Sequence, residues 1–379
     1  MTRGKTTRVL CAPDKLRGAL DAAGAAAALA AGARGAGAEA VELPIADGGE
    51  GTLDAFRDGA TLHAVAVHDA LGRPRTGRIA QLDDATFLVE AAEAVPLHGL
   101  AEHERDVLRA SSYGAGELIA AALDRGARRL LVAVGGTATM DGGAGMLRAL
   151  GARCATDGAG LLADQSLDLS GLDPRLAGGA AGARGADEGP GPHAAAVAIE
   201  LLVDVAAPLT GPDGAAHRFG PQKGATAEQV EALDAAHARW AQALGIDPAT
   251  PGAGAAGGLG AALQALGART VAGADTVLDL KRFDALLAGC DVCLTAEGSV
   301  DASTLQGKAV AAVVARCAAA GVPVVVLGGR VEPEAAAELR RRGARDVRAI
   351  GPAGRPLAEA LAAAAGELEA AARAAVAGA

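Results

Sequence analysis

The chain alternates short apolar runs with longer segments of helical spacing, and most of the apolar runs lead into glycine-rich loops. Continuous apolar runs are typical of strands buried in a parallel sheet, whereas apolar residues three or four positions apart indicate a helix with one buried face. Strands are predicted at 8–11, 40–43, 62–68, 86–90, within 128–136, and at 291–295, 322–327 and 347–350. Helices are predicted in the Ala-rich segment that ends near Ala33, over 114–124, in the second half of 135–146, from about Thr276, Leu305 and Pro333, and in the C-terminal Ala-rich segment.

The alternation is most regular from about residue 276 to the C-terminus. It predicts an α/β fold in which helices cover both faces of a parallel sheet. Ligands bind beyond the carboxyl ends of the strands in such sheets, so functional residues are expected in the loops that follow strands. The stretch 178–192, rich in Gly, Ala and Pro, has no periodicity and is predicted to be a mobile surface loop.

The composition is that of a globular protein, and 379 residues suggest two domains, or three, at about 100 to 200 residues each. Aromatic residues make up 2% and the net charge is -10, so surfaces for base stacking or for phosphate backbones are disfavoured. Nucleic acid is therefore not expected as a partner. The first apolar run breaks at Pro13 and Asp14, too early for a secretion signal, and no uncharged apolar stretch is long enough to span a membrane. We expect a soluble cytoplasmic protein.

The five cysteines are an odd number in a long chain, which argues against a disulfide framework. Cys290 and Cys293 form a CxxC within a segment that resembles a buried strand, where residues three apart point to opposite faces. No second CxxC or histidine cluster accompanies them. Packing is therefore favoured over metal or redox chemistry.

Four segments share one design, in which a predicted strand ends in a loop that combines glycines with acidic side chains. They are APDKLRG at 12–18, ADGGEGT at 46–52, GGTATMDGG at 135–143 and AEGSVDASTLQGK at 296–308. Each alone is more often a turn than a site, but four together favour a site. Glycines let backbone N–H groups approach an anion, and carboxylates beside an anion are favourable when a cation is bound or a proton is to be accepted. A phosphate, Mg²⁺ and a hydroxyl would meet both conditions.

Four cations lie in or beside glycine-containing turns: Lys15, Arg17, Lys223 and Lys308. Any one of them alone would more often be a solvated surface charge. Their association with glycine-rich turns makes an anion clamp an equal alternative.

Several known phosphate and hydrolase motifs are absent from the sequence. There is no GxxxxGK[ST], and the HRD and DFG patterns of protein kinases do not occur. A GxGxxG spans 252–257, but it follows a turn-rich segment rather than a strand, so a dinucleotide site is disfavoured. The absence of GxSxG and HExxH argues against serine hydrolases and zinc peptidases of those types.

Taken together, the segments resemble the type I glycerate kinases, a family of bacterial ATP-dependent enzymes. The resemblance runs in family order from residue 8 to beyond 308. Its segments are APDKLRGAL, ADGGEGT, SSYGAGELI, GGTATMDGGAGMLRALGA, LTGPDGAAHRFGPQKGA, GAGAAGGLG and LTAEGSVDASTLQGKA. It implies transfer of a phosphoryl group from ATP to a hydroxyl of D-glycerate with Mg²⁺, most often giving 2-phosphoglycerate.

The resemblance also implies a fold and an organisation. The fold would be a flavodoxin-like α/β domain formed by 1–75 and 285–379, with a second α/β domain, 76–284, inserted into it. The active site would lie in the cleft between the domains. A homodimer is an open alternative, and the small-molecule substrates would be D-glycerate and ATP.

On this basis the candidate site residues fall into three groups. The catalytic candidates are Asp47, Glu50, Asp141 and Arg17, with one carboxylate as the base that accepts the hydroxyl proton and another as a metal ligand. The candidates for substrate or phosphate binding are Asp14, Gly48, Gly49, Gly135, Gly136, Thr137, Gly142, Gly143, Lys223 and Lys308. The metal candidates are Asp204, Glu297 and Asp301. For Glu297 and Asp301, a helix-capping pair is an equal alternative.

The chain departs from the family pattern at several substrate-side positions. Arg17 stands where the family has lysine, and Met140 stands where many members have asparagine. Ala207 replaces the asparagine before proline, and Ser299 and Ser303 replace arginine and glutamine. Every acidic position is kept, but the groups that hold the glycerate carboxylate are left open. So are the choice between the 2- and 3-hydroxyl, a kinase of another small hydroxy acid, and a binding protein that has lost turnover.

Overall fold

The computed structural model describes residues 6–176, 196–204 and 206–378. The stretch 178–192, predicted to be a mobile loop, lies outside the described residues. The chain forms two compact units, one of Met1–Asp47 with Ala272–Ala379 and one of Gly48–Val271. The predicted domain limits of 1–75 with 285–379, and 76–284, stay a prediction.

The first unit is built on one parallel sheet of five strands. These are β1 (Arg8–Cys11), β2 (Glu39–Glu42), β9 (Val292–Val300), β10 (Val324–Val331) and β11 (Asp346–Ala349). Their spatial order is β11-β10-β9-β1-β2, and every neighbouring pair is parallel. Counted in chain order within this unit, the order is 2-1-3-4-5, the flavodoxin-like arrangement. The order reverses between β1 and β9, and a ligand is expected at the carboxyl ends of those two strands.

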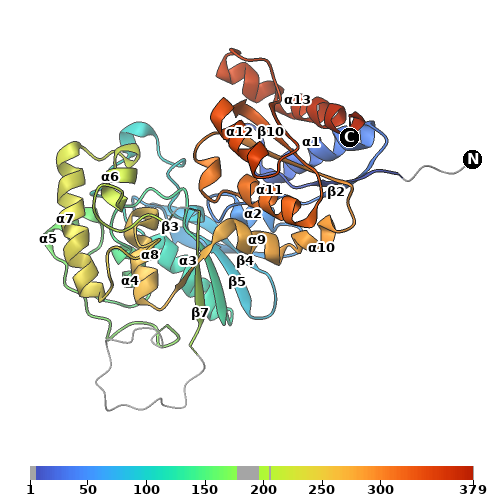
Figure 1. The fold of residues 1–379 in the computed structure, drawn as a ribbon. Coiled ribbons are helices and arrows are strands. Elements are labelled where there is room, and N and C mark those ends of the chain that lie inside the picture. The colour runs from blue at the N-terminus through green and yellow to red at the C-terminus, as the bar shows by residue number, and fades with distance from the viewer. Residues whose placement is uncertain (1–5, 177–195, 205, 379) are drawn as a thin grey trace, which may run out of the picture. The chain divides into compact units, whose positions relative to one another are not determined.

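Helices cover both faces of this sheet, as predicted (Figure 1). The first face carries α1 (Ala22–Gly35) and α13 (Leu357–Ala377), and the second carries α9 (Gly273–Leu280), α10 (Phe283–Leu287), α11 (Ala309–Ala320) and α12 (Pro333–Arg341). Side chains alternate between the faces because the period of a strand is two, so Val9 and Cys11 pack with α1 while Leu10 packs with the other layer. Gly32 lets α1 approach α13, since a Cβ there would lie 2.2 Å from Glu369 O.

The second unit contains a mixed sheet of six strands in the order β3-β4-β5-β6-β7-β8. They are β3 (Thr61–His68), β4 (Pro74–Gln81), β5 (Thr86–Glu90), β6 (Arg129–Ala133), β7 (Ala198–Val203) and β8 (Arg269–Ala272), the last ending at the boundary of the unit. The β3-β4-β5 pairings are antiparallel, and β5, β6 and β7 pair in parallel. Consequently the carboxyl ends of β5, β6 and β7 lie along one edge of the sheet.

Helices pack around this second sheet over a core that includes Phe87, Leu118 and Trp240. They are α2 (Thr52–Ala55), α3 (Tyr113–Asp124), α4 (Ala144–Ala149), α5 (Gly158–Ala163), α6 (Ala215–Phe219), α7 (Ala227–Leu244) and α8 (Ala255–Ala265). The longest, α7, begins with a capping box in which Thr226 and Gln229 exchange hydrogen bonds between side chain and backbone.

Two predicted boundaries shift in the first unit. The strand predicted at 291–295 continues to Val300, because its second half pairs with β10, and it therefore includes Glu297. The helix predicted from about Leu305 begins at Ala309, after a turn.

The expectation that Cys290 and Cys293 share a strand is wrong. Cys290 precedes β9 and its thiol donates to Leu286 O at 3.2 Å, whereas Cys293 is buried in β9. All five cysteines are free thiols.

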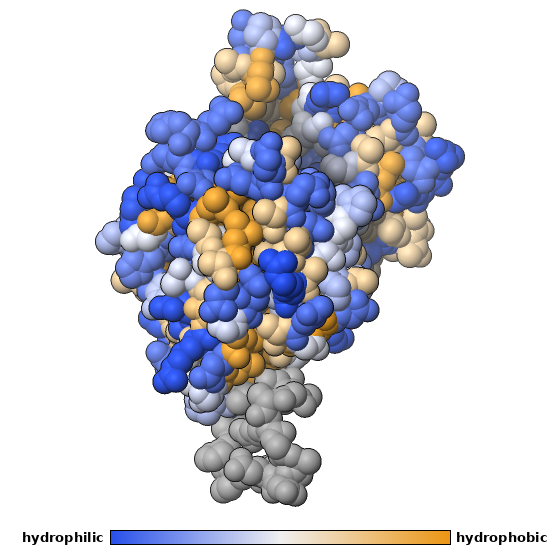
Figure 2. Space-filling view, turned by 90° about the vertical axis from the view of Figure 1, so that its left-hand side faces the viewer, coloured by the Kyte–Doolittle hydropathy of each residue, from blue (hydrophilic) through white to orange (hydrophobic). Residues whose placement is uncertain are grey.

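The face seen in Figure 2 carries small hydrophobic patches bordered by hydrophilic residues. Tyr113 and Leu357 are the large apolar side chains that remain exposed among the described residues. None of the helices in the described part of the chain is both long and apolar enough to cross a bilayer.

Candidate active site

In the first unit, backbone hydrogen bonds bring three loops together at the strand-order reversal. The parallel ladder of β1 and β2 continues past the ends of both strands, where Ile45 N donates to Pro13 O at 3.0 Å. On the other side of β1, Asp14 N donates to Ala296 O at 2.9 Å. Asp14 is therefore held between the loop that contains Asp47 and the strand segment that contains Glu297.

This proximity has an electrostatic consequence. Burial, and then the charge of Asp47, raises the pKa of Asp14 from 3.8 to about 8. Burial also raises the pKa of Glu297 from 4.5 to about 7, with smaller contributions from Asp301 and Asp47. The raised pKa values of Asp14 and Glu297 show that negative charge is disfavoured here, and a divalent cation would stabilise the charged carboxylates.

A chain of hydrogen bonds continues from Glu297 along the following loop. The buried Thr304 hydroxyl donates to Glu297 Oε1 at 2.7 Å, and Asp301 Oδ1 accepts from Ser303 N at 2.8 Å. Lys308 Nζ in turn donates to Ser303 Oγ at 2.6 Å. Asp301 and Lys308 thus belong to one polar loop, in which both contact Ser303.

Arg17 lies on the exposed part of the loop after β1. A Cβ at Gly298 would come within 3.2 Å of Arg17 N, so this loop passes close to β9. The backbone at Arg17 is thereby placed near Glu297, while its guanidinium stays accessible.

In the second unit, the loop after β6 packs directly on the glycine-rich segment before α2. A Cβ at Gly135 would lie 2.6 Å from Gly49 Cα, and one at Gly136 would lie 2.9 Å from Glu50 Cβ. Gly136 also has a φ of 77°, which disfavours any residue with a side chain. These glycines therefore bring Glu50 against the strand end, and Glu50 Oε2 lies 3.0 Å from His98 Nδ1.

Thr137 follows in the same loop and is 2% exposed, yet its hydroxyl has no hydrogen-bond partner in the described part of the chain. A buried hydroxyl without a partner costs free energy, about 1 to 3 kcal/mol, unless a ligand or water satisfies it. It is a group that an incoming oxyanion could use.

Asp141 is fully buried and serves as an anchor for backbone. Its Oδ2 accepts from Ser112 N at 2.7 Å, from Ser112 Oγ at 2.8 Å and from Gly145 N at 3.1 Å, and its Oδ1 accepts from Gly143 N at 3.2 Å. Burial raises the pKa of Asp141, and these hydrogen bonds oppose that rise. Ser112 belongs to SSYGAGELI, so these hydrogen bonds join this motif to the Asp141 loop.

Lys223 and the segment GAGAAGGLG support the same loop from other directions. Lys223 is 4% exposed, and its Nζ donates to Thr139 O at 2.9 Å. Gly257 crosses the loop so closely that a Cβ would lie 2.0 Å from Thr139 O, and its own carbonyl accepts from Gly142 N at 3.0 Å. Ala256 has a φ of 54° within this crossing, which is a strained value for alanine.

Replacing Lys223 by Met is expected to raise Tm relative to wild type by more at pH 6 than at pH 9. Burial lowers the pKa of Lys223 from 10.5 to about 7. Below pH 7 the folded wild-type protein carries a buried ammonium. Between pH 7 and 10.5 Lys223 binds more protons in the unfolded chain than in the folded one, so the destabilisation that Lys223 causes in the wild type decreases as the pH rises. Thermal unfolding of both proteins at the two pH values measures this, and a pH-independent difference would contradict the buried charge.

The predicted site residues divide between the two units. Asp14, Arg17, Asp47, Glu297, Asp301 and Lys308 lie in the first unit, and Gly48, Gly49, Glu50, Gly135, Gly136, Thr137, Asp141, Gly142, Gly143, Asp204 and Lys223 lie in the second. Asp204 directly follows β7, the parallel neighbour of β6, so it is placed at the same sheet edge as the Gly135 loop. Among the described residues, no three His, Cys, Asp or Glu side chains are grouped as a ready metal site.

Three residues were missed by the sequence analysis. Ser112 joins Asp141 to α3, His98 pairs with Glu50, and Glu90 accepts backbone N–H groups beside Glu50. Ser112 could have been found because it lies in a family-like segment, and Glu90 because it ends a predicted strand. His98 lies in none of the glycine-containing motifs, so the sequence around it does not indicate its contact with Glu50.

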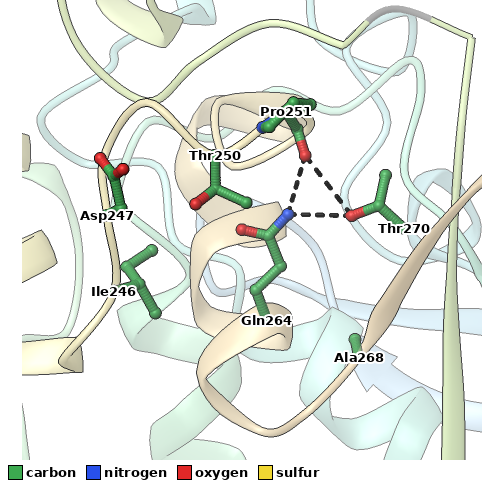
Figure 3. Close-up of a pocket in the computed structure, with 7 residues that line it drawn as sticks. All are labelled: Ile246, Asp247, Thr250, Pro251, Gln264, Ala268 and Thr270. Atoms are coloured by element: carbon green, nitrogen blue, oxygen red, sulfur yellow. Dashed lines mark hydrogen bonds between the residues drawn. The ribbon is translucent and has the colours of Figure 1, made fainter.

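A separate pocket in the second unit is lined by Ile246, Asp247, Thr250, Pro251, Gln264, Ala268 and Thr270 (Figure 3). Gln264 Nε2 donates to Pro251 O and to Thr270 Oγ1, both at 2.9 Å. None of the predicted site residues lines this pocket.

Comparison with known proteins agrees with the fold and the loops. Residues 9–378 match the model of the glycerate kinase family. The chain is 37% identical to a glycerate kinase from Bacillus subtilis (strain 168), over 97% of this chain and 96% of that protein. It is 36% identical to a glycerate 2-kinase from Escherichia coli (strain K12), over 79% of each. A crystal structure from Salmonella typhimurium LT2, assigned as a glycerate kinase 2, superposes with a TM-score of 0.80 at 35% identity and covers 98% of both chains.

The flavodoxin-like sheet, the acidic loops at its carboxyl edge and these relatives define an enzyme of the phosphotransferase class. The chain belongs to the glycerate kinase family. The family and the fold class predicted from the sequence are thereby confirmed.

Proposed function

We propose that this enzyme transfers the γ-phosphoryl group of ATP to the 2-hydroxyl of D-glycerate, giving 2-phosphoglycerate and ADP. The bond between the γ-phosphorus and the ADP oxygen breaks, and a bond between that phosphorus and the glycerate oxygen forms. The hydroxyl proton passes to a carboxylate of the enzyme. Family membership supports the kinase reaction, and the E. coli relative is named a glycerate 2-kinase.

The observation that carries this proposal is the loop after β6. It combines a glycine of positive φ, Gly136, with the buried and unpartnered hydroxyl of Thr137, and it packs on Glu50. Glycine turns at the ends of strands let backbone N–H groups face a phosphate. A phosphate placed there would satisfy the orphaned hydroxyl and lie beside a carboxylate.

The reaction also requires a base and ligands for Mg²⁺, and carboxylates can serve as both. Asp47 and Glu50 are the proposed candidates for the base, because each lies in the ADGGEGT loop and is only half buried. The proposed Mg²⁺ ligands are Asp204, Glu297 and Asp301. Mg²⁺ is commonly held in kinases by one or two carboxylates together with substrate phosphates, so a preformed cluster of three ligands is not required. When bound, the ion neutralises charge on the phosphate oxygens.

The remaining predicted residues bind the anions in this proposal. Arg17 is exposed and Lys308 is half buried, and both are assigned to phosphate or to the glycerate carboxylate. Asp14, with its raised pKa, is assigned to a hydrogen bond with the substrate. Lys223 contributes through the Thr139 carbonyl that it holds.

A second candidate is a kinase of another small hydroxy acid, or one that forms 3-phosphoglycerate. Another acid is permitted by Ala207, Ser299 and Ser303, which replace amide and guanidinium groups on the substrate side. A cytoplasmic location and a homodimer stay predictions.

Purified enzyme with D-glycerate, ATP and Mg²⁺ is expected to release ADP and to phosphorylate carbon 2, which ³¹P-coupled NMR of the product identifies. A panel of small hydroxy acids, assayed for ADP release, tests the alternative. Phosphorylation at carbon 3, or faster turnover of another acid, would replace the proposed product. ATP binding without ADP release in the whole panel would contradict the kinase proposal.

A further inference from the structure

We propose that Glu90 is a positioning residue, whose buried carboxylate fixes the turn Gly51–Leu53 and thereby holds Glu50 against the loop Gly135–Thr137. Its effect on turnover rests on the proposed function, whereas its effect on the turn does not. Glu90 is the last residue of β5 and is 3% exposed.

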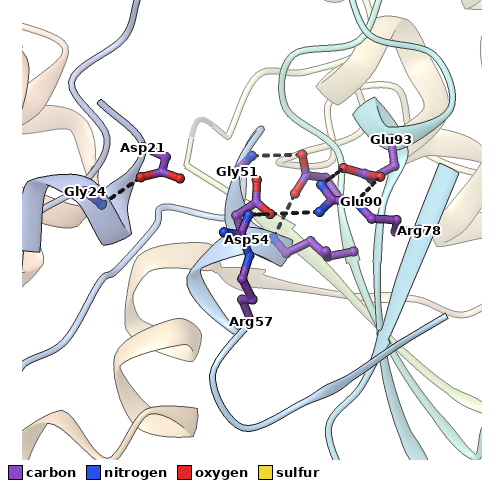
Figure 4. A network of polar contacts seen from close by, with 9 residues as sticks. Asp21, Gly24, Gly51, Asp54, Arg57, Arg78, Glu90 and Glu93 are labelled. Atoms are coloured by element: carbon purple, nitrogen blue, oxygen red, sulfur yellow. Dashed lines mark hydrogen bonds and ion pairs between the residues drawn. The ribbon is translucent and has the colours of Figure 1, made fainter. Parts of the chain in front are cut away.

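The contacts of Glu90 are directed at backbone donors. Its Oε1 accepts from Gly51 N and its Oε2 from Leu53 N, both at 2.8 Å (Figure 4). Burying a carboxylate is costly unless it is hydrogen-bonded, and hydrogen bonds to a charged group are stronger than those between neutral groups. The turn therefore gains much from this one side chain, because α2 has only four residues and little stability of its own.

A group of ion pairs around Asp54 and Arg78, the Asp54 ion-pair group, holds α2 near its C-terminal end. Asp54 Oδ1 accepts from Arg78 Nη1 at 3.0 Å and from Arg57 Nη2 at 2.9 Å, and Arg78 also pairs with Glu93. Figure 4 shows this ion-pair group next to the Glu90 contacts. Its side chains are more accessible than Glu90, so its strength is reduced by solvent. These ion pairs hold Asp54 within α2, whereas Glu90 holds Gly51, the residue that follows Glu50.

Glu50 is consequently restrained from several sides. The next residue, Gly51, is held by Glu90, the Gly136 backbone abuts Glu50 Cβ, and His98 pairs with the carboxylate. Loss of the Glu90 contacts frees the turn while leaving the other two. A shift of about 1 Å in a reacting group can lower turnover about 10²-fold, so this restraint matters for catalysis.

The test compares Glu90→Gln with two matched controls. Gln has the shape of Glu but keeps only one acceptor oxygen, and its amino group would face a backbone donor. Asp54→Asn weakens only the Asp54 ion-pair group, that is, the contacts of Asp54 with Arg78 and Arg57. Glu117→Gln alters a carboxylate that also accepts a backbone N–H, from His68 at 2.7 Å, but in another part of the unit. Each variant is assayed for kcat and for the KM of both substrates, and hydrogen exchange is followed at the Gly51 and Leu53 amides.

For Glu90→Gln we expect at least tenfold faster exchange at those two amides, a kcat lowered by about 10- to 100-fold, and a KM for ATP within a few-fold of wild type. Both controls should leave exchange at these amides and kcat nearly unchanged. In Glu90→Ala, added formate should restore part of kcat, because a small carboxylate can occupy the vacated space and accept both N–H groups.

The outcomes separate the steps of the proposal. Unchanged exchange in Glu90→Gln would overturn the anchoring of the turn. Faster exchange with unchanged kcat would overturn the link to catalysis, and so would an equal fall of kcat in Asp54→Asn. If Glu90→Gln unfolds at the assay temperature, Glu90→Asp, which keeps the charge, takes its place. Absence of glycerate turnover in the wild type would contradict the proposed function alone, since the exchange measurement needs no substrate.

Discussion

The variant Asp47→Asn is expected to lower kcat for D-glycerate phosphorylation by about 10² or more, because general-base contributions are of that order. Asp47 lies at the carboxyl edge of the flavodoxin-like sheet, beside Asp14 and Glu297. Asparagine keeps the size of the side chain but neither accepts a proton nor supplies a negative charge to a metal.

The same substitution should not destabilise the fold, and it should raise Tm relative to wild type by more at pH 8 than at pH 5. The folded pKa of Asp14 is about 8, and that of Glu297 about 7, both above their ordinary values. Asp14 and Glu297 therefore bind more protons in the folded protein than in the unfolded chain between about pH 4 and 8, and their contribution to wild-type stability falls as the pH rises through this range. Asp47 contributes to both shifts, so removing its charge relieves part of that loss. A stabilised but inactive variant is the signature of a functional carboxylate.

Steady-state kinetics and thermal unfolding, the latter with EDTA present, measure these effects. Glu39→Gln is the matched control, since Glu39 is an exposed carboxylate at the opposite end of β2. Turnover of Asp47→Asn within a few-fold of wild type would remove Asp47 from the reaction. A fall in Tm at both pH values would assign it a structural role.

The second large effect is expected for Asp141→Asn, which should lose both stability and activity. Asp141 is fully buried, and its two oxygens accept four hydrogen bonds from Ser112, Gly143 and Gly145. An amide group in either orientation would place a donor against backbone or hydroxyl donors. Leaving buried donors unsatisfied costs about 1 to 3 kcal/mol each, so the free energy of unfolding should fall by an amount of that order.

Turnover of Asp141→Asn should fall by about 10² or more, because the displaced loop carries the proposed phosphate-binding residues. Denaturant unfolding and kinetics test both parts. Asp157→Asn is the control, since Asp157 caps α5 through Gly160 N at 2.8 Å without touching this loop. If Asp141→Asn were as stable as wild type but inactive, Asp141 would act directly on the substrate rather than through the loop.

Much of the fold could be predicted from local pattern. The strands at 8–11 and 86–90 were predicted at their observed limits, because continuous apolar runs are readily recognised. β4 was not predicted, since its sequence PRTGRIAQ is polar and half exposed. Its strand conformation depends on pairing with β3 and β5. The length of β9 was likewise decided by pairing, with β10.

The candidate site was predicted less completely. The glycine and acidic loops were recognisable because they follow strands. The sequence could not predict that Asp141 accepts hydrogen bonds from Ser112, or that Lys223 donates one to the Thr139 carbonyl. The partners in each pair come from distant segments of the chain. The role of Glu90 could not be predicted for the same reason, because the donors Gly51 N and Leu53 N lie 39 and 37 residues earlier in the chain.

Local sequence pattern is enough to predict the alternation of strands and helices, the family, and the loops in which the acidic and glycine residues occur. Which of these side chains are buried, which contact one another and which have perturbed pKa values depends on the tertiary contacts. The physical reason is that periodicity and turn chemistry act over a few residues, whereas desolvation and hydrogen bonding depend on strand order. In this chain strand order brings Asp14 beside Glu297, 283 residues later in the sequence.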